Sequence, residues 1–247
     1  MLGLPPGIKA CLFDLDGVLT RTATVHAAAW KQMFDAFLRD WAARSGQPFV
    51  PFDAGDDYDA YVDGRPRLDG TRAFLQSRGI DLPEGSPDDP PGELTVHGLS
   101  NRKNEIVLRM FREGKVEVFE GSVRYVRAVR EAGLRAAVVS SSANTAEVLD
   151  AAGIAHLFDA RIDGLVALER HLAGKPAPDT FLAGATALGA GPATAAVFED
   201  ALAGVEAGRA GEFALVVGVD RVGQAEELRR HGADVVVADL SELLEDR

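Results

Sequence analysis

The stretch KACLFDLDGVLT, residues 9–20, decides the fold, because it joins a strand-like apolar run to two carboxylates. Residues 10–13 are apolar, and Asp14 and Asp16 follow directly. Residues two apart in an extended segment point to the same side, so both carboxylates can face one site. Gly17 permits the turn that comes next. Burying charge is costly unless the charge is paired or bound to a metal, so we predict a buried strand that ends at a charged functional site.

The same Asp-x-Asp spacing recurs at residues 57–59, which shows that the spacing alone is weak evidence. This second pair lies in a stretch rich in Gly, Pro and Asp, and we interpret it as part of a polar surface loop.

Further apolar runs alternate with helical patterns in the second half of the chain. The expected strands are LRAAVVS, LFDARI, TAAVF, FALVVGV and DVVVADL, and the expected helices lie near residues 122–132, 144–152, 179–188, 203–211 and 223–231. Strands that are continuous apolar runs and alternate with helices indicate a parallel sheet covered on both faces. We therefore predict an α/β, Rossmann-like core.

The segment after the first strand has a different pattern. Its apolar residues recur at helical spacing, which predicts a core-facing stripe of Trp30, Met33, Phe34, Phe37, Leu38 and Trp41. Residues 45–70 favour a loop with short elements, and helices are expected near 69–78 and 101–113. The predicted domains are a core of residues 1–20 and 115–247 and a mostly helical insertion of residues 21–114.

Composition limits the possible classes of protein. The chain has 247 residues and a net charge of −12, whereas a nucleic-acid-binding protein needs a basic face. The one cysteine, Cys11, lies in an apolar run and is interpreted as a core residue. We see no signal-peptide pattern and no apolar run near the ~20 residues that span a bilayer. We therefore expect a cytoplasmic protein.

Two other predicted strand ends carry polar side chains, and ligands of open parallel sheets bind beyond such ends. Glu199 and Asp200 follow one strand; they can meet the dipole of the next helix or, with Asp14 and Asp16, supply oxygen ligands to Mg²⁺. Another strand leads into a polar loop that can cap a helix or bind an anion, namely Ser140, Ser141, Ser142 and Asn144. Lys175 lies between Gly174 and Pro176 and is either a surface charge or a fixed cation.

One reaction unites these groups. An aspartate nucleophile, a magnesium ion, a hydroxyl donor and a lysine can accept a phosphoryl group as an aspartyl phosphate. A second aspartate can protonate the leaving oxygen and later deprotonate the incoming one.

These residues resemble the haloacid dehalogenase superfamily of aspartate-nucleophile phosphotransferases. Its motifs are matched in order by FDLDGVLT, VVSSS, GKPAPD and FEDALAG. The resemblance implies that Asp14 is the nucleophile, that Asp16 is the general acid/base, and that Ser140 and Lys175 hold the transferring phosphoryl group. It also implies a Mg²⁺ site of Asp14, the Asp16 carbonyl and Asp200, with Glu199 as a ligand or just behind the ligands.

Within this superfamily the insertion is similar to the helical cap of the β-phosphoglucomutase subfamily, which closes over the site and sets specificity. The resemblance implies that substrate-binding residues are Thr22, His26, Gly64, Arg67, Lys103, Ser141, Ser142 and Asn144. Arg67 matches the arginine that binds the second phosphate, and Lys103 matches a lysine that faces the acid/base. A planar guanidinium is suited to gripping two phosphate oxygens.

The sequence also departs from the subfamily. Asp63 and Ala143 stand where members often have lysine, and Gly70 stands where a substrate-contacting serine can occur. These differences leave open a different sugar phosphate or a phosphatase for small sugar phosphates. We expect a Mg²⁺-dependent monomer that converts β-glucose 1-phosphate to glucose 6-phosphate through glucose 1,6-bisphosphate, with no nucleic-acid or membrane partner. A non-catalytic binding protein on this fold is disfavoured by the intact set of motif residues.

Overall fold

The chain is described here by a computed structural model that covers residues 2–113 and 116–244. Its contacts divide it into two units, Met1–Arg21 with Val116–Arg247, and Thr22–Lys115. We call the first the sheet unit and the second the helical unit. The elements of the sheet unit are β1 (Ala10–Phe13), α4 (Glu120–Glu131), β2 (Arg135–Val139), α5 (Thr145–Ala151), a 3₁₀ turn (Ala155–Leu157), β3 (Ala160–Ile162), α6 (Gly164–Glu169), α7 (Asp179–Ala187), a 3₁₀ turn (Pro192–Thr194), β4 (Ala195–Glu199), α8 (Leu202–Ala210), β5 (Leu215–Val219), α9 (Ala225–His231), β6 (Val235–Val237) and a 3₁₀ turn (Leu240–Leu243).

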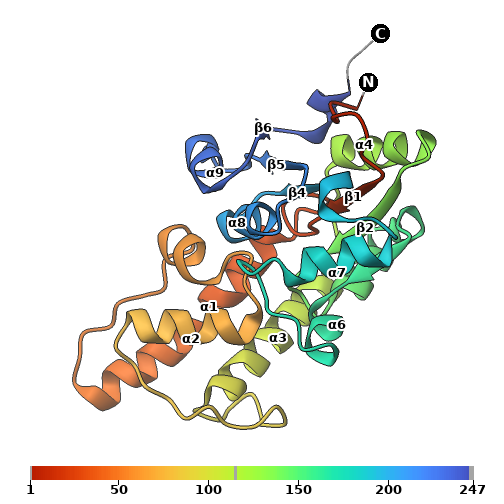
Figure 1. The fold of residues 1–247 in the computed structure, drawn as a ribbon. Coiled ribbons are helices and arrows are strands. Elements are labelled where there is room, and N and C mark those ends of the chain that lie inside the picture. Colours follow the sequence, from red (N-terminus) through yellow and green to blue (C-terminus); the bar gives the residue numbers. More distant parts are fainter. Residues whose placement is uncertain (1, 114–115, 245–247) are drawn as a thin grey trace. The chain divides into compact units, whose positions relative to one another are not determined.

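The strands form one parallel sheet in the order β3-β2-β1-β4-β5-β6, which confirms the predicted α/β class (Figure 1). The central strand β1 pairs with β2 and β4, so that Leu12 lies opposite Ala137 and Val197. Strand order reverses beside β1, and ligands of such sheets bind at this switch point. Asp14 follows β1 directly and therefore lies where the topology favours a site.

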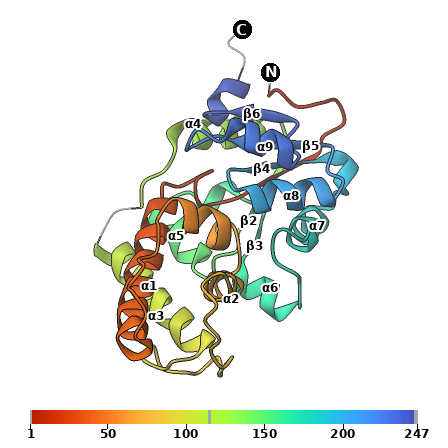
Figure 2. The ribbon, with the colours of Figure 1, turned by 90° about the vertical axis from the view of Figure 1, so that its left-hand side faces the viewer.

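The side chains of β1 alternate between the two faces of the sheet. Leu12 packs in a cluster with Phe181 of α7 and Val205 of α8. Phe13 points to the other face, where it stacks on Phe198 at 4.5 Å between ring centroids and meets Tyr125 of α4 edge-on at 6.3 Å. Figure 2 shows the same sheet with these helices from a second direction. Because both faces of β1 are covered, the strand is buried throughout, and Cys11 is a core residue as predicted.

The helical unit consists of α1 (Ala23–Ser45), a π-helical turn (Tyr58–Val62), α2 (Arg67–Ser77) and α3 (Val96–Glu113). The predicted aromatic stripe of α1 is its core, where Trp30 stacks on Phe34 at 5.2 Å between centroids. Phe34 in turn stacks on Phe52, also at 5.2 Å. Phe52 comes from the segment predicted as loop, and its full burial ties that segment to α1.

Several elements differ from the predictions in extent. Helix α3 begins at Val96 rather than near residue 101, because the Thr95 hydroxyl accepts a hydrogen bond from the Gly98 amide at 2.9 Å. Helix α6 was not predicted; the carboxylate of Asp163 caps it by accepting from the amides of Leu165 and Val166. The run LFDARI forms a strand only over its last three residues, Ala160–Ile162.

The second Asp-x-Asp pair is more than a solvated loop, which corrects the prediction. Asp57 precedes the π-helical turn and forms an ion pair with Arg78 at 2.6 Å. Its carboxylate also accepts the Asp53 amide at 2.8 Å. Asp57 therefore has a local structural role.

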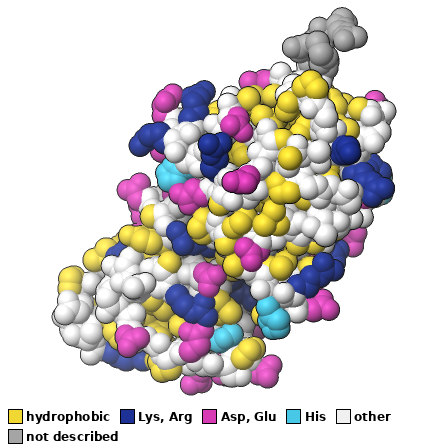
Figure 3. Space-filling model, viewed as in Figure 1, with side chains coloured by type: hydrophobic (Ala, Val, Ile, Leu, Met, Phe, Trp, Pro, Cys, Tyr) yellow, Lys and Arg dark blue, Asp and Glu magenta, His cyan; other side chains and the backbone are white. Residues whose placement is uncertain are grey.

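The surface in Figure 3 shows acidic side chains interspersed with Lys and Arg. The net charge of −12 is thus not gathered in a single acidic patch on that face. Among the described residues, no helix combines the length and apolar character that a membrane crossing requires.

Candidate active site

A buried lysine joins three of the predicted strand ends. The Lys175 ammonium donates to Asp14 Oδ1 and to Glu199 Oε1, both at 2.5 Å. It also donates to the carbonyl of Val139, the last residue of β2, at 3.2 Å. Lys175 is 3% exposed, so it is a fixed cation and not a surface charge. The structure thereby brings together the ends of β1, β2 and β4, as the parallel sheet predicts.

Burial and charge oppose each other in this cluster. Burial raises the pKa of Asp14 well above its usual range, the Lys175 ammonium opposes this shift, and the carboxylates of Glu199 and Asp16 add to it. Burial also lowers the pKa of Lys175, but Asp14 and Glu199 outweigh burial and raise it overall. Lys175 therefore stays protonated and favours the ionised form of Asp14, which a nucleophile requires.

Glu199 contacts both the buried lysine and the start of the next helix. Its Oε1 accepts from Lys175, while its Oε2 accepts from the Ala201 amide at 3.0 Å, next to the start of α8. A Cβ atom on Gly204 of α8 would lie 1.8 Å from Glu199 Oε1. The glycine therefore makes room for the carboxylate that holds Lys175 in place.

Gly17 makes similar room for Asp200. A Cβ atom on Gly17 would lie 1.7 Å from Asp200 Oδ2, and the residue has φ +85°, a conformation that favours glycine. The turn after Asp16 thus packs closely against the Asp200 carboxylate. This requirement explains the glycine of FDLDG in physical terms.

The acidic side chains fit a divalent cation. Asp14, Glu199 and Asp200 each offer a carboxylate oxygen, and these oxygens lie within 4.8 Å of one another. Hard oxygen donors are the ligands of Mg²⁺. Among the described residues, a single ammonium contacts Asp14 and Glu199, which leaves an excess of negative charge in the cluster of three carboxylates that a divalent ion would offset.

The serine loop after β2 is held by its own hydroxyls. Ser140 Oγ accepts from the Ser142 amide at 3.1 Å, and Ser142 Oγ accepts from the Asn144 amide at 3.2 Å. Asn144 is the N-cap residue of α5 but makes no side-chain cap hydrogen bond. Ser141 is the half-buried residue between the two serines. The loop is therefore ordered by internal bonds next to the Val139 carbonyl that Lys175 contacts.

Asp16 lies in a tight turn beyond Asp14. The Gly17 amide donates to the Thr20 carbonyl at 2.8 Å, and the Thr20 amide donates to the Leu15 carbonyl at 2.9 Å. Asp16 is half-buried and influences the pKa of Asp14, so the two carboxylates lie near each other.

In the helical unit the structure brings two predicted residues together. The Lys103 Nζ lies 2.8 Å from His26 Nδ1 and 5.0 Å from the centre of the Trp30 ring. Lys103 is 4% exposed. Its burial against an imidazole and an indole face distinguishes it from an ordinary surface lysine.

Arg67 contacts Asn104, the residue that follows Lys103 on α3. Its Nη1 donates to Asn104 Oδ1 at 2.6 Å, and its Nε is buried without a hydrogen-bond partner among the described residues. Asn104 was not predicted; its adjacency to Lys103 on α3 was the available signal. Gly64 precedes Arg67 with φ +67°, and Thr22 is a buried residue at the start of α1.

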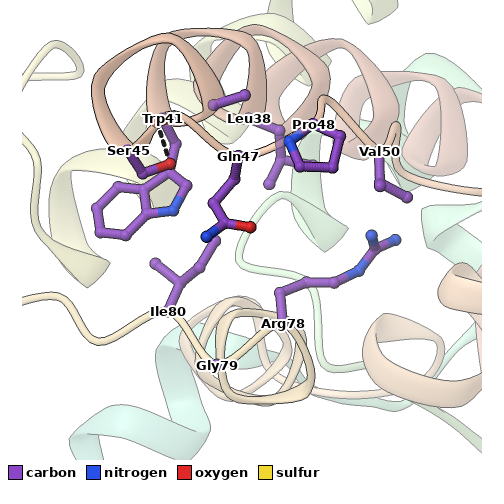
Figure 4. Close-up of a pocket in the computed structure, with 10 residues that line it drawn as sticks. Leu38, Trp41, Ser45, Gln47, Pro48, Val50, Arg78, Gly79 and Ile80 are labelled. Atoms are coloured by element: carbon purple, nitrogen blue, oxygen red, sulfur yellow. Dashed lines mark hydrogen bonds between the residues drawn. The ribbon is translucent and has the colours of Figure 1, made fainter.

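A separate groove occupies the far end of α1. It has a volume of ≈ 540 Å³ and is lined by α1, by residues 47–50 after α1 and by residues 78–80 after α2. Gln47 projects between Trp41 and Arg78 (Figure 4). None of the predicted site residues line it. His26 lies at the opposite end of α1, roughly 18 Å from Leu38 at 1.5 Å per helical residue. The groove is thus distinct from the His26–Lys103 pair.

The fold and this set of strand-end groups define an aspartate-based phosphotransferase core, and comparison with known proteins agrees. The chain belongs to the haloacid dehalogenase-like hydrolase family, whose model matches residues 8–211.

Individual relatives are more specific. The chain is 59% identical to the β-phosphoglucomutase of Mycobacterium tuberculosis, over 99% of this chain and 94% of the relative. It is 31% identical to the β-phosphoglucomutase of Bacillus subtilis, over 96% of this chain and 92% of the relative. The solved β-phosphoglucomutase structure from Clostridium difficile has a TM-score of 0.75 and 26% identity, and the match covers 96% of this chain and 93% of that one.

Replacement of Gly204 by alanine tests the Glu199–Lys175 contact. The added Cβ would displace the Glu199 carboxylate, so we expect kcat for any accepted phosphomonoester to fall about 10- to 100-fold, the usual cost of disturbing a supporting contact. Gly191→Ala is the matched control, because a Cβ at Gly191 meets open space. Circular dichroism confirms folding. A Gly204→Ala variant with wild-type kcat would show that Glu199 need not hold Lys175.

Proposed function

We propose that this chain catalyses the β-phosphoglucomutase reaction, the conversion of β-glucose 1-phosphate to glucose 6-phosphate through glucose 1,6-bisphosphate. The observation that carries the chemistry is the buried Lys175 ammonium bridging Asp14 and Glu199. The choice of sugar rests on the 59% identity to the mycobacterial enzyme of that name.

Asp14 is the proposed nucleophile. One of its carboxylate oxygens forms a bond to phosphorus while the bond from phosphorus to the sugar oxygen breaks, which leaves an aspartyl phosphate. Lys175 already contacts Oδ1, so it fixes the orientation of the carboxylate and is placed to offset charge on the phosphoryl oxygens. Ser140 would donate its hydroxyl to the same phosphoryl group.

Asp16 is the proposed general acid and base. It gives a proton to the departing sugar oxygen in the first half-reaction. In the second half-reaction it takes a proton from the sugar hydroxyl that attacks the aspartyl phosphate. Such acid–base help is typically worth ~10²–10⁴-fold in rate.

The cation ligands would be the side chains of Asp14 and Asp200, with the Asp16 carbonyl. Because both Glu199 oxygens already accept hydrogen bonds, Glu199 supports the cluster through Lys175 and Ala201. When bound, Mg²⁺ supplies charge neutralisation to the phosphoryl oxygens and the carboxylates.

A mutase must bind a second phosphate besides the one that is transferred. Arg67 is suited to that role, because its buried Nε lacks a partner among the described residues and a bound phosphate oxygen would satisfy it. Ser142 and Asn144 of the loop after β2 are the residues that the family resemblance assigns to a phosphate that is not transferred, and Ser141 is a further proposed substrate-binding residue of that loop. Gly64 gives the turn that leads to Arg67, and Thr22, His26 and Lys103 would contact the sugar or the acid/base.

The alternative is hydrolysis, in which water attacks the aspartyl phosphate. The same residues would then produce glucose and inorganic phosphate, and the relatives favour the mutase. The expectations of a monomer, a cytoplasmic location and no nucleic-acid partner stay predictions.

Product analysis separates these two functions. The purified enzyme with Mg²⁺ is given β-glucose 1-phosphate with and without catalytic glucose 1,6-bisphosphate, and products are followed by ³¹P NMR. We expect glucose 6-phosphate, formed faster with the bisphosphate, because the bisphosphate phosphorylates Asp14. Release of glucose and phosphate as the sole products would contradict the mutase function and identify a phosphatase.

Arg67→Gln tests the second phosphate site. Loss of a charge-assisted hydrogen bond costs roughly 1.5–3 kcal/mol, so KM for β-glucose 1-phosphate should rise about 10- to 100-fold. The matched control is Arg72→Gln on the same helix, where the arginine pairs with Asp69 and Glu84 at the surface. An unchanged KM in Arg67→Gln, equal to that of the control, would remove Arg67 from the site.

A further inference from the structure

The loop after β5, residues 220–224, is an ordered element that the proposed reaction does not use. Asp220 Oδ1 accepts from the amides of Gly223 and Gln224 at 2.7 and 2.8 Å, and more weakly from Val222. This carboxylate fixes the loop in one conformation. The loop then presents Arg221 and Gln224 to two catalytic segments.

Arg221 binds the turn that carries Asp16. Its Nε donates to the Gly17 carbonyl at 2.7 Å, and its Nη2 lies 3.4 Å from the Val18 carbonyl. Its Nη1 donates to the Ala238 carbonyl at 2.7 Å, which ties the guanidinium to the residue that follows β6. The Gly17 and Val18 carbonyls are more than 200 residues away from Arg221 in the sequence.

The same guanidinium packs on the segment that leads into α4. Its central carbon lies 3.5 Å from the centroid of the Phe119 ring, a cation–π contact. The Phe119 amide donates to the Leu19 carbonyl at 2.9 Å, and Thr20 and Val118 form an antiparallel bridge. Arg221 therefore contacts two segments of the sheet unit, one shortly before Arg21 and one shortly after Val116, where the chain leaves this unit and returns to it.

Gln224 binds the other catalytic segment. Its Nε2 donates to the Asp200 carbonyl at 3.1 Å. The Asp200 carboxylate packs on Gly17, the residue whose carbonyl Arg221 binds. The turn of Asp16 and the Asp200 segment are thus held together from one loop.

We propose that Arg221, supported by Gln224, is a positioning residue that fixes the Asp16–Gly17 turn against Asp200 and so sets both the cation site and the acid/base. This inference rests on the proposed function for the roles of Asp16 and Asp200. A lysine cannot replace Arg221, because a single ammonium cannot span the Gly17, Val18 and Ala238 carbonyls while stacking on Phe119.

The test uses Arg221→Lys, which keeps the positive charge but loses the planar guanidinium and its several hydrogen-bond donors. In the absence of substrate, Mn²⁺ binding is titrated by electron paramagnetic resonance. We expect the Mn²⁺ dissociation constant to rise about 10- to 100-fold and kcat to fall by a similar factor, with KM within about threefold. The matched control is Arg229→Gln, an exposed arginine on α9 paired with Glu226, and it should change neither quantity.

A second variant covers the case in which Arg221→Lys does not fold. Gln224→Met removes the contact with the Asp200 carbonyl and should weaken Mn²⁺ binding at least about threefold, with the far-ultraviolet circular dichroism spectrum unchanged. Wild-type Mn²⁺ affinity and kcat in Arg221→Lys, or wild-type Mn²⁺ affinity in Gln224→Met, would overturn the proposal.

The readouts also separate this inference from the proposed function. Mn²⁺ titration needs no sugar, and kcat can be measured with p-nitrophenyl phosphate. If the wild type fails to isomerise β-glucose 1-phosphate while Arg221→Lys still weakens Mn²⁺ binding, the mutase function fails and the role of Arg221 stands.

Discussion

The site depends on one interaction, the buried ammonium of Lys175 between the carboxylates of Asp14 and Glu199. Without this cation, Asp14 would favour the protonated form, because burial raises its pKa. The Lys175 ammonium opposes this shift and orients the carboxylate at the end of the central strand. A buried ion pair of this kind is weak evidence for stability, since desolvation offsets the attraction. It is better explained by the chemistry that a charged, immobile carboxylate allows.

The rest of the sheet unit serves to keep that cluster in register. Parallel pairing brings the ends of β1, β2 and β4 to one edge, so Lys175 reaches Asp14, Glu199 and the Val139 carbonyl at once. Two glycines, Gly17 and Gly204, remove the side chains that would collide with Asp200 and Glu199. Close packing and the chemistry therefore require the same two glycines, because the carboxylates of Asp200 and Glu199 occupy space that a Cβ would otherwise fill.

Much of this was predictable from the sequence, for a physical reason. Apolar runs that end in polar groups identify strands and their ligand-binding ends, and so Asp14, Glu199 and the serine loop could be named beforehand. Lys175 was named from its Gly-Pro loop and from the motif GKPAPD. Helix boundaries were less predictable, because caps such as Thr95 and Asp163 act through local geometry. Arg221 and Asn104 were missed for a different reason. Their contacts join residues distant in sequence, several of them through backbone carbonyls that carry no sequence signal.

The central claim is that Asp14 accepts the phosphoryl group, and direct detection of the acyl phosphate tests it most sharply. The enzyme is mixed with glucose 1,6-bisphosphate and Mg²⁺, quenched in acid, digested, and the peptides are weighed by mass spectrometry. The account predicts one phosphoryl group on the peptide that contains Asp14, lost on treatment with hydroxylamine, and none in Asp14→Asn. A phosphoryl group on Ser140 or another residue, or equal labelling of Asp14→Asn, would contradict it.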